Sequence, residues 1–254
     1  MNPVLVLDVM RFELARSMTI GRIAIWFALV TFPVTLISIL RMKVPIDPIE
    51  PIGFAVYFLV PEVVCLLGLL LWATPAIATE IEGQTWIYLA MRQSGRVTVL
   101  MGKYLTAVAW SLSAALVAAT LCVVIVNAPE SLRMWWVMCA LATLSCFAHA
   151  AIFLLIGVIF HRRTMVMAVV YTLGIEYGLS FVPAVANKIT VNYHLRGLLA
   201  DWMKWDEIRT QAETLYGIEL ASTHLAALGL YTVTLLCVSI IRLTTAEFPT
   251  QQDG

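Results

Sequence analysis

The chain has 254 residues, of which 61% are hydrophobic and 13% are charged, and its formal net charge is zero. Soluble domains carry about 25% charged residues, so this composition excludes an ordinary soluble globular protein and indicates a polytopic membrane protein. The five cysteines lie inside apolar runs without Cys-x-x-Cys spacing, which is typical of small buried side chains rather than of disulfides or metal ligands.

The first segment, 1–20, predicts a helix that lies flat in the membrane interface. Its apolar residues recur on one helical stripe, formed by Leu7, Met10, Leu14 and Met18. Arg11 and Arg16 could then face the lipid phosphates. Charged residues interrupt the segment too early for a cleavable signal peptide. A tail that simply continues into the first span is the alternative.

Six apolar runs are long enough to cross a hydrocarbon core of about 30 Å, which requires roughly 20 helical residues. We expect these spans at 21–40, 53–78, 104–126, 135–160, 164–186 and 223–243. The predicted fold class is therefore all-α, with six transmembrane helices in a single transmembrane domain that covers 1–254. Small residues at helical spacing in the third and fifth spans favour close helix packing.

The basic residues of the short connections predict that both termini are cytosolic. One set of connections holds Arg11, Arg16, Arg22, Arg92, Arg96, Lys103, Arg162, Arg163 and Arg242. The opposite short connections hold only Arg41, Lys43 and Arg133. Because cytosolic loops carry an excess of Lys and Arg, the first set is placed inside and the long connection 187–222 becomes an outer loop.

The stretch 79–103, TEIEGQTWIYLAMRQSGRVTVLMGK, is the only long charged interruption between apolar segments in the first half of the chain. Thr79 and Glu82 form a Thr-x-x-Glu pair that can cap a helix, and Gly83 breaks the helix arriving from the second span. Thr85 can then cap a second helix of about two turns. Such a helix is too short to be stable alone in water, so it needs a packing partner.

The loop thus combines an acidic start, a short apolar helix and a basic exit. The residues that carry this pattern are Glu80, Glu82, Gly83, Thr85, Trp86, Leu89, Arg92, Ser94, Arg96, Gly102 and Lys103. The pattern resembles the first cytosolic loop of ABC transporter permease subunits of the ABC-2 type (type-2 exporter class), and the order of spans extends the resemblance over nearly the whole chain. Gln93 departs from the family pattern, which has Pro there.

The resemblance implies that 79–103 contains a cytosolic coupling helix that docks on a separate ABC ATPase subunit. The expected ATPase-coupling residues are Glu80, Glu82, Gly83, Thr85, Trp86, Leu89, Arg92, Arg96 and Lys103. It also implies an N-terminal elbow helix, a second permease subunit in a homodimer or heterodimer, and a place in the cell (inner) membrane. Membrane lipid is a further expected partner, whereas nucleic acid is not. An amphipathic loop lying on lipid headgroups is the alternative.

The resembled permeases have re-entrant helices between their fifth and sixth spans. Within the outer loop of this chain, 191–205 is the candidate, because its apolar residues are too many to be left solvated. The residues concerned are Leu195, Leu198, Leu199, Trp202, Met203 and Trp205. Aromatic side chains packed at headgroup level, without a gating role, are an equally open interpretation.

Three ionisable residues fall inside the predicted spans, namely Glu62, His149 and Glu176. On insertion scales each costs at least ~2.5 kcal/mol at mid-bilayer unless it is hydrated or paired, so none is expected to face lipid. Glu62 and Glu176 are the candidate residues of a polar transport pathway. The structural alternative is that a neighbouring hydroxyl satisfies each of them.

Motifs for catalysis do not occur in the sequence. It contains no Gly-x-x-x-x-Gly-Lys-Ser/Thr, no His-Glu-x-x-His and no Gly-x-Ser-x-Gly. We therefore expect no catalytic residue, metal or cofactor, and ATP hydrolysis on the partner. Two other functions are weighed: a non-transporting membrane anchor or assembly subunit that recruits a soluble partner through the 79–103 loop, and an intramembrane enzyme.

The predicted topology can be checked by cysteine labelling. A Lys204→Cys variant should react with a membrane-impermeant maleimide from outside the cell, because 187–222 is placed outside by the distribution of Lys and Arg. The control Arg162→Cys should react only after permeabilisation. Labelling of Lys204→Cys from the cytosolic side alone would contradict the orientation.

Overall fold

The computed structural model describes residues 3–43, 49–82, 95–160, 162–179, 185–205 and 220–245, and the side chains at 81–82 and 185–186 are not described. Over these ranges the chain is helical and has no strand, which confirms the all-α class. Five helices in them are long and apolar enough to cross a membrane, where the sequence predicts six.

The elements follow in chain order. They are α1 (Pro3–Ser17), α2 (Ile20–Lys43), α3 (Glu50–Tyr57), the π-helical η1 (Phe58–Val64), α4 (Cys65–Trp72), α5 (Pro75–Glu82), α7 (Gly95–Val126), α8 (Ser131–Ile159), α9 (Thr164–Tyr171), the π-helical η2 (Thr172–Tyr177), the 3₁₀ helix η4 (Val185–Ile189), α10 (Val191–Met203) and α12 (Ala221–Thr245). The second span is the continuous run α3, η1, α4 and α5. The other four long spans are α2, α7, α8 and α12.

The span expected at 164–186 differs from the prediction. Its described helix is the shorter apolar segment Thr164–Tyr177, formed by α9 and η2, so a sixth full span is not confirmed. The helix widens at its end, where the Gly178 N–H donates to the Leu173 carbonyl at 2.9 Å. Residues 180–184 of the expected span lie outside the described residues, and at the end of η2 the Glu176 carboxylate accepts from the first N–H groups of α10.

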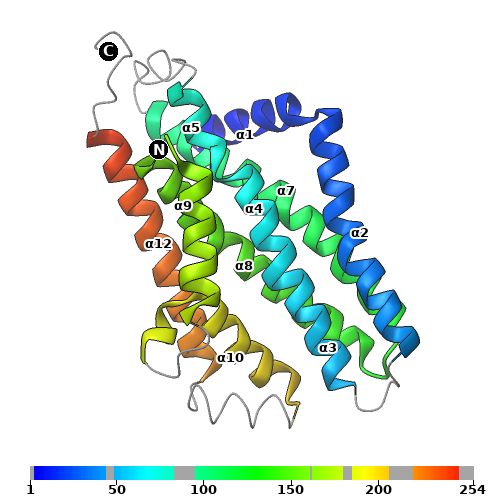
Figure 1. The fold of residues 1–254 in the computed structure, drawn as a ribbon. Helices are drawn as coiled ribbons and strands as arrows, with labels where there is room; N and C mark the ends of the chain where they lie inside the picture. The colour runs from blue at the N-terminus through cyan, green and yellow to red at the C-terminus, as the bar shows by residue number, and fades with distance from the viewer. Residues whose placement is uncertain are drawn as a thin grey trace.

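The long helices run side by side, while α1 lies across one end of the bundle and α10 lies at the other (Figure 1). The C-terminal end of α12 is at the same end as α1. The centre is formed by α7 and α8, which contact each other and most of the remaining helices. The predicted small-residue face of α7 is buried there, in the residues Ala107, Ser111, Ala115 and Ala119. Gly174 in η2, by contrast, has open space where a Cβ would be.

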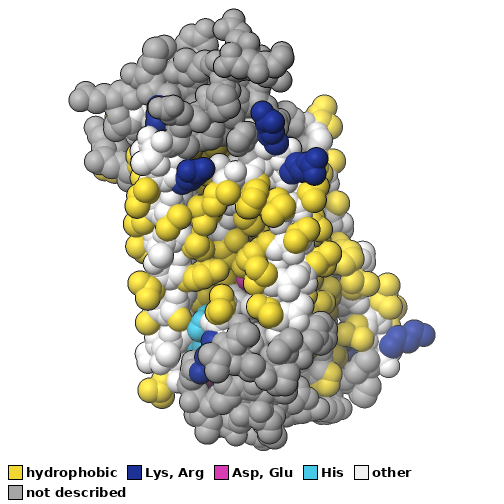
Figure 2. All heavy atoms as spheres, turned by 60° about the vertical axis from the view of Figure 1, so that its left-hand side comes forward, with side chains coloured by type: hydrophobic (Ala, Val, Ile, Leu, Met, Phe, Trp, Pro, Cys, Tyr) yellow, Lys and Arg dark blue, Asp and Glu magenta, His cyan; other side chains and the backbone are white. Residues whose placement is uncertain are grey.

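The surface of the bundle is apolar along its length. Hydrophobic side chains occupy the middle of the face in Figure 2, and Lys and Arg side chains lie toward its ends. The helices α2 and α12 are the least buried spans and expose large apolar residues such as Phe27, Leu36, Val233 and Ile241. A soluble monomer rarely exposes so continuous an apolar surface. Together with the five apolar helices, this indicates a multi-pass membrane protein.

The N-terminal segment is helical, and the bundle covers only part of its predicted stripe. Val6 and Ser17 are buried, Met10 and Leu14 of the stripe are half-buried, and Leu7 and Met18 are exposed. The packed face is selected by α7, because Val9 lies directly against Gly102, where a Cβ would collide with it. The position of α1 therefore depends on a close backbone approach to α7, which hydrophobic periodicity alone does not reveal.

Candidate functional site

The middle of the predicted coupling loop lies outside the described residues. This applies to Gly83, Thr85, Trp86, Leu89 and Arg92, and to the side chain of Glu82. Glu80, Arg96 and Lys103 are described, and they lie on the two helices that flank the segment. The structure therefore shows how the ends of the loop are held, while the coupling helix itself stays a prediction.

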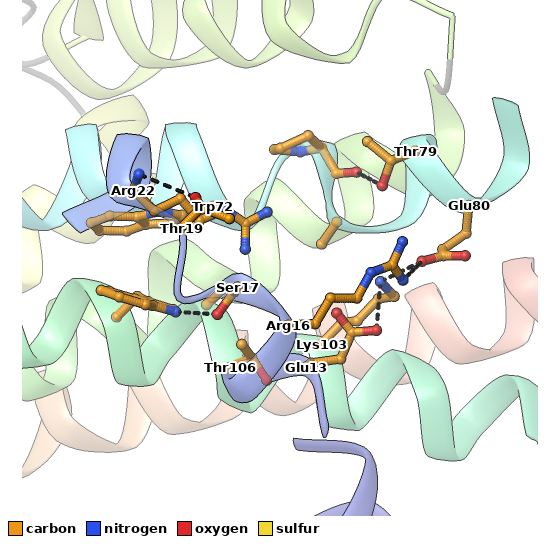
Figure 3. Close-up of a pocket in the computed structure, with 14 residues that line it drawn as sticks. Glu13, Arg16, Ser17, Thr19, Arg22, Trp72, Thr79, Glu80, Lys103 and Thr106 are labelled. Carbon is orange, nitrogen blue, oxygen red and sulfur yellow. Dashed lines mark hydrogen bonds and ion pairs between the residues drawn. The ribbon is translucent and has the colours of Figure 1, made fainter. Parts of the chain in front are cut away.

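The side chain of Lys103 joins three helices at this end of the bundle (Figure 3). It projects from α7, is only 6% exposed, and its Nζ lies 3.0 Å from Glu80 Oε1 on α5 and 3.2 Å from Glu13 Oε1 on α1. Arg16 Nη1 is 3.7 Å from the same Glu80 oxygen. A buried ammonium group is tolerated only when it is paired, so α1 and α5 are fixed to α7 at this point.

The second flank of the loop is tied to the last helix. Arg96, in the first turn of α7, donates from Nη1 to the Thr244 carbonyl at 3.0 Å and to the Leu243 carbonyl at 3.4 Å. These carbonyls belong to the C-terminal turn of α12, where backbone oxygens lack helical partners and a cation is favourable. The residues that flank the undescribed segment are thus bound to α1, α7 and α12.

The opposite end of the bundle contains the helix that the sequence suggests for 191–205. Thr190 caps it by accepting from the Tyr193 N–H at 3.2 Å, and it ends at Lys204, whose φ of 55° is left-handed. Its apolar face, with Leu195, Leu198 and Leu199, is fully buried. The predicted short helix within 191–205 is therefore present as a packed element, α10, and its place on the outer side stays a prediction.

Glu62 binds this helix through a bidentate ion pair. Its two carboxylate oxygens accept from Arg196 Nε at 2.7 Å and from Arg196 Nη2 at 3.0 Å, and the glutamate has no exposed surface. Glu62 lies in η1 directly after Pro61, where the carbonyl of Pro61 accepts from Ser145 Oγ on α8 at 2.6 Å. Planar bidentate pairs of this kind are among the stronger charged hydrogen bonds in proteins.

Glu176 binds the beginning of the same helix. Its Oε1 accepts from the Tyr171 hydroxyl at 2.5 Å and from the Val191 N–H at 3.3 Å, and its Oε2 accepts from the Asn192 N–H at 3.2 Å. His149 Nε2 lies 3.8 Å from Oε2. A carboxylate at a helix N-terminus meets unsatisfied N–H groups and the positive end of the helix dipole. Both buried glutamates therefore hold α10, and their role in a pathway stays a prediction.

The described part of the chain holds a few buried side-chain polar atoms without a hydrogen bond, namely both amide atoms of Asn192, Tyr57 Oη, Thr74 Oγ1 and His149 Nε2. The side-chain amide of Asn192 is fully buried, yet neither its nitrogen nor its oxygen makes a hydrogen bond there. Buried amides are normally satisfied, because an unmade hydrogen bond costs about 1–3 kcal/mol. The interior next to α10 thus contains a hydrogen-bond donor and an acceptor that no described residue satisfies.

Sequence reasoning missed the partners of the predicted residues. Arg196 was not singled out, nor were Glu13 and Arg16 as contacts of the loop. The signal for Arg196 was available, since it is the one Lys or Arg in 191–203, and Glu62 is the one charged residue in the expected second span. Charge complementarity between buried segments would have suggested the pair.

Comparison with known proteins provides no relative from which a function could be transferred. No protein-family model matches the chain, and no curated protein matches it. The function is therefore inferred from the loop pattern in the sequence and from the contacts described above.

The Glu62–Arg196 pair makes a direct prediction for stability. Arg196→Met should destabilise the protein by about 2–3 kcal/mol, because it leaves Glu62 buried without a counter-charge. The loss is placed below the ~3–5 kcal/mol of a fully buried pair, since 20% of the Arg196 side chain is exposed. Thermal unfolding in detergent measures the effect. The control Glu62→Met/Arg196→Met should recover most of the loss, and a double variant as unstable as the single one would contradict the assignment.

Proposed function

We propose that the chain is the membrane-spanning permease subunit of an ATP-driven ABC transporter of the ABC-2 type. In this proposal a separate ATPase subunit hydrolyses ATP, a second permease subunit completes the transmembrane unit, and a substrate is exported. Both termini and the 79–103 loop lie in the cytosol, and α10 lies on the outer side of the cell (inner) membrane.

The observation that carries the proposal is the way the ends of the loop are fastened. Lys103 binds Glu80 and Glu13, and Arg96 binds the end of α12. The two flanks of the loop are therefore connected to four helices, α1, α5, α7 and α12. A partner that displaced the loop would move these helices as rigid elements rather than bend a flexible linker. Firm attachment of this kind is what a coupling loop requires.

Contacts continue from the loop toward α10. The helix α5, which leads into the loop, packs against α9, and α9 runs on into η2. Glu176 of η2 accepts from the first N–H groups of α10. We propose that movement at the loop reaches α10 through this series and changes access to the outer side. The polar groups beside α10, including Asn192, would then contact the substrate path.

The docking of the loop is tested by association with an ABC ATPase subunit that is co-expressed with the chain. Trp86→Ala and Leu89→Asp should each weaken co-purification of that ATPase, since truncating a hot-spot residue commonly costs ~2 kcal/mol or more. The matched control is Trp136→Ala, at an exposed tryptophan of α8. If both loop variants retained the ATPase as well as the control does, the loop would not be the docking element.

The competing function, a membrane anchor or assembly subunit, is distinguished by turnover. An anchor would bind its partner through the loop, but ATP hydrolysis by the complex would not depend on groups near α10. In a permease subunit, by contrast, ATP hydrolysis by the complex would depend on the groups near α10. Measuring ATPase activity of the reconstituted complex for variants on the outer side therefore separates the two functions.

Glu176→Gln is the variant that makes this comparison. Glutamine keeps the shape, and its single carbonyl oxygen can still accept from one of the two α10 N–H groups that the carboxylate binds, so assembly and ATPase binding should be retained. Loss of the charge should reduce turnover of the complex in proteoliposomes roughly tenfold, as expected for one charged hydrogen bond. Turnover equal to wild type at equal expression would rule out a required charge at this position.

A further inference from the structure

A pocket beside the junction of α1 and α2 adjoins the Lys103–Glu80 contact, and the proposed function assigns it no ligand. Its volume is about 290 Å³, and it is bounded by α1, α2, α5 and α7 (Figure 3). The polar residues that line it include Glu13, Arg16, Ser17, Thr19, Arg22 and Lys103. Its volume is close to the lower limit of about 300 Å³ for small-molecule sites.

The charges around the pocket leave one positive charge in excess. Two carboxylates, Glu13 and Glu80, face three cations, Arg16, Arg22 and Lys103. Lys103 Nζ is within 3.2 Å of both carboxylates, and the side chain is only 6% exposed. Its ammonium group is therefore already paired and is not available to a ligand. A ligand that carries a single negative charge would bring the pocket to neutrality.

The two arginines are the groups that remain available to a ligand. The Arg16 side chain is 64% exposed, and among the described residues its one ion pair is the long 3.7 Å contact with Glu80. The backbone N–H of Arg22 donates to Thr19 Oγ1 at 3.4 Å, but within the described part of the chain the Arg22 guanidinium makes no hydrogen bond or ion pair. Guanidinium groups bind phosphate oxygens in a bidentate manner, which makes phosphate the ligand group that this arrangement favours.

The other walls of the pocket are aromatic and adjoin the apolar surface. Trp72 and Trp110 stack with ring centroids 5.7 Å apart, and the Trp110 Nε1–H donates to Ser17 Oγ at 2.7 Å. Next to the pocket, α2 exposes Ile20, Ile23 and Phe27. Cationic donors beside an exposed apolar helix suit a ligand with a charged head and hydrocarbon chains rather than a free ion.

We propose that this pocket binds the phosphodiester of an anionic phospholipid, drawn from the leaflet at the end of the bundle where α1 lies. Arg16 and Arg22 contact the phosphate oxygens, and the acyl chains lie along the exposed side of α2. The single negative charge of phosphatidylglycerol matches the excess charge of the pocket. The inference does not depend on the ATPase partner, so it can fail or succeed independently of the proposed transport function.

The test uses the delipidated full-length chain in a neutral detergent. Binding of dioleoylphosphatidylglycerol is measured by native mass spectrometry, with dioleoylphosphatidylcholine and inorganic phosphate as separate probes. Arg22→Gln should weaken binding of phosphatidylglycerol about fivefold, the effect of one basic residue near a lipid phosphate. Arg41→Gln, at the far end of the same helix, is the matched control and should leave binding unchanged.

The outcomes separate the possible sources of the phosphate. Retention of phosphatidylglycerol by Arg22→Gln at the wild-type level would overturn the proposal, and so would an equal loss in Arg41→Gln. Equal binding of phosphatidylcholine would show that the pocket does not select a negative charge. Competition by inorganic phosphate at equal concentration would show that the ligand is a free anion rather than a lipid. Arg16→Gln is a second variant, which can replace Arg22→Gln if that variant does not fold. It should show the same selective loss of phosphatidylglycerol binding.

Discussion

Pairing of buried charges is the constraint on which this bundle depends. Lys103, Glu62 and Glu176 lie in an apolar interior where an unpaired charge would be prohibitively costly, and each is paired with a group from another part of the chain. Lys103 joins α1 and α5 to α7, Glu62 joins η1 to α10, and Glu176 joins η2 to α10. In a bilayer, close van der Waals packing holds the helices together, whereas these pairs determine which faces meet.

The pairs also divide the molecule into two anchored ends. At one end, the flanks of the 79–103 loop are bound to α1, α7 and α12, and at the other end both glutamates hold α10. Between them, α5 packs on α9, which continues into η2. Elements held in this way can move as rigid bodies, which is the motion that the proposed coupling requires.

Hydropathy was enough to predict the helical class and the positions of α2, α7, α8, α12 and the second span, because long apolar runs have no other stable form in a bilayer. It did not predict how the described helix from Thr164 ends, where the Glu176 carboxylate accepts from the first N–H groups of α10. Nor did it predict the packed face of α1, which Gly102 selects, or Arg196 as the partner of Glu62. These features arise from contacts between distant segments, which periodicity within one segment cannot show.

We propose that the loop and α10 move together, and a distance measurement at the end of the bundle where α10 lies tests this most directly. Spin labels at Met42→Cys on α2 and Asp201→Cys on α10, both exposed, would be placed in a Cys237→Ala background and assembled with the ATPase. The account predicts that trapping ATP shifts the distance distribution between the labels, and that Lys103→Met reduces this shift while the ATPase stays bound. A distribution that is the same with and without trapped ATP would contradict it.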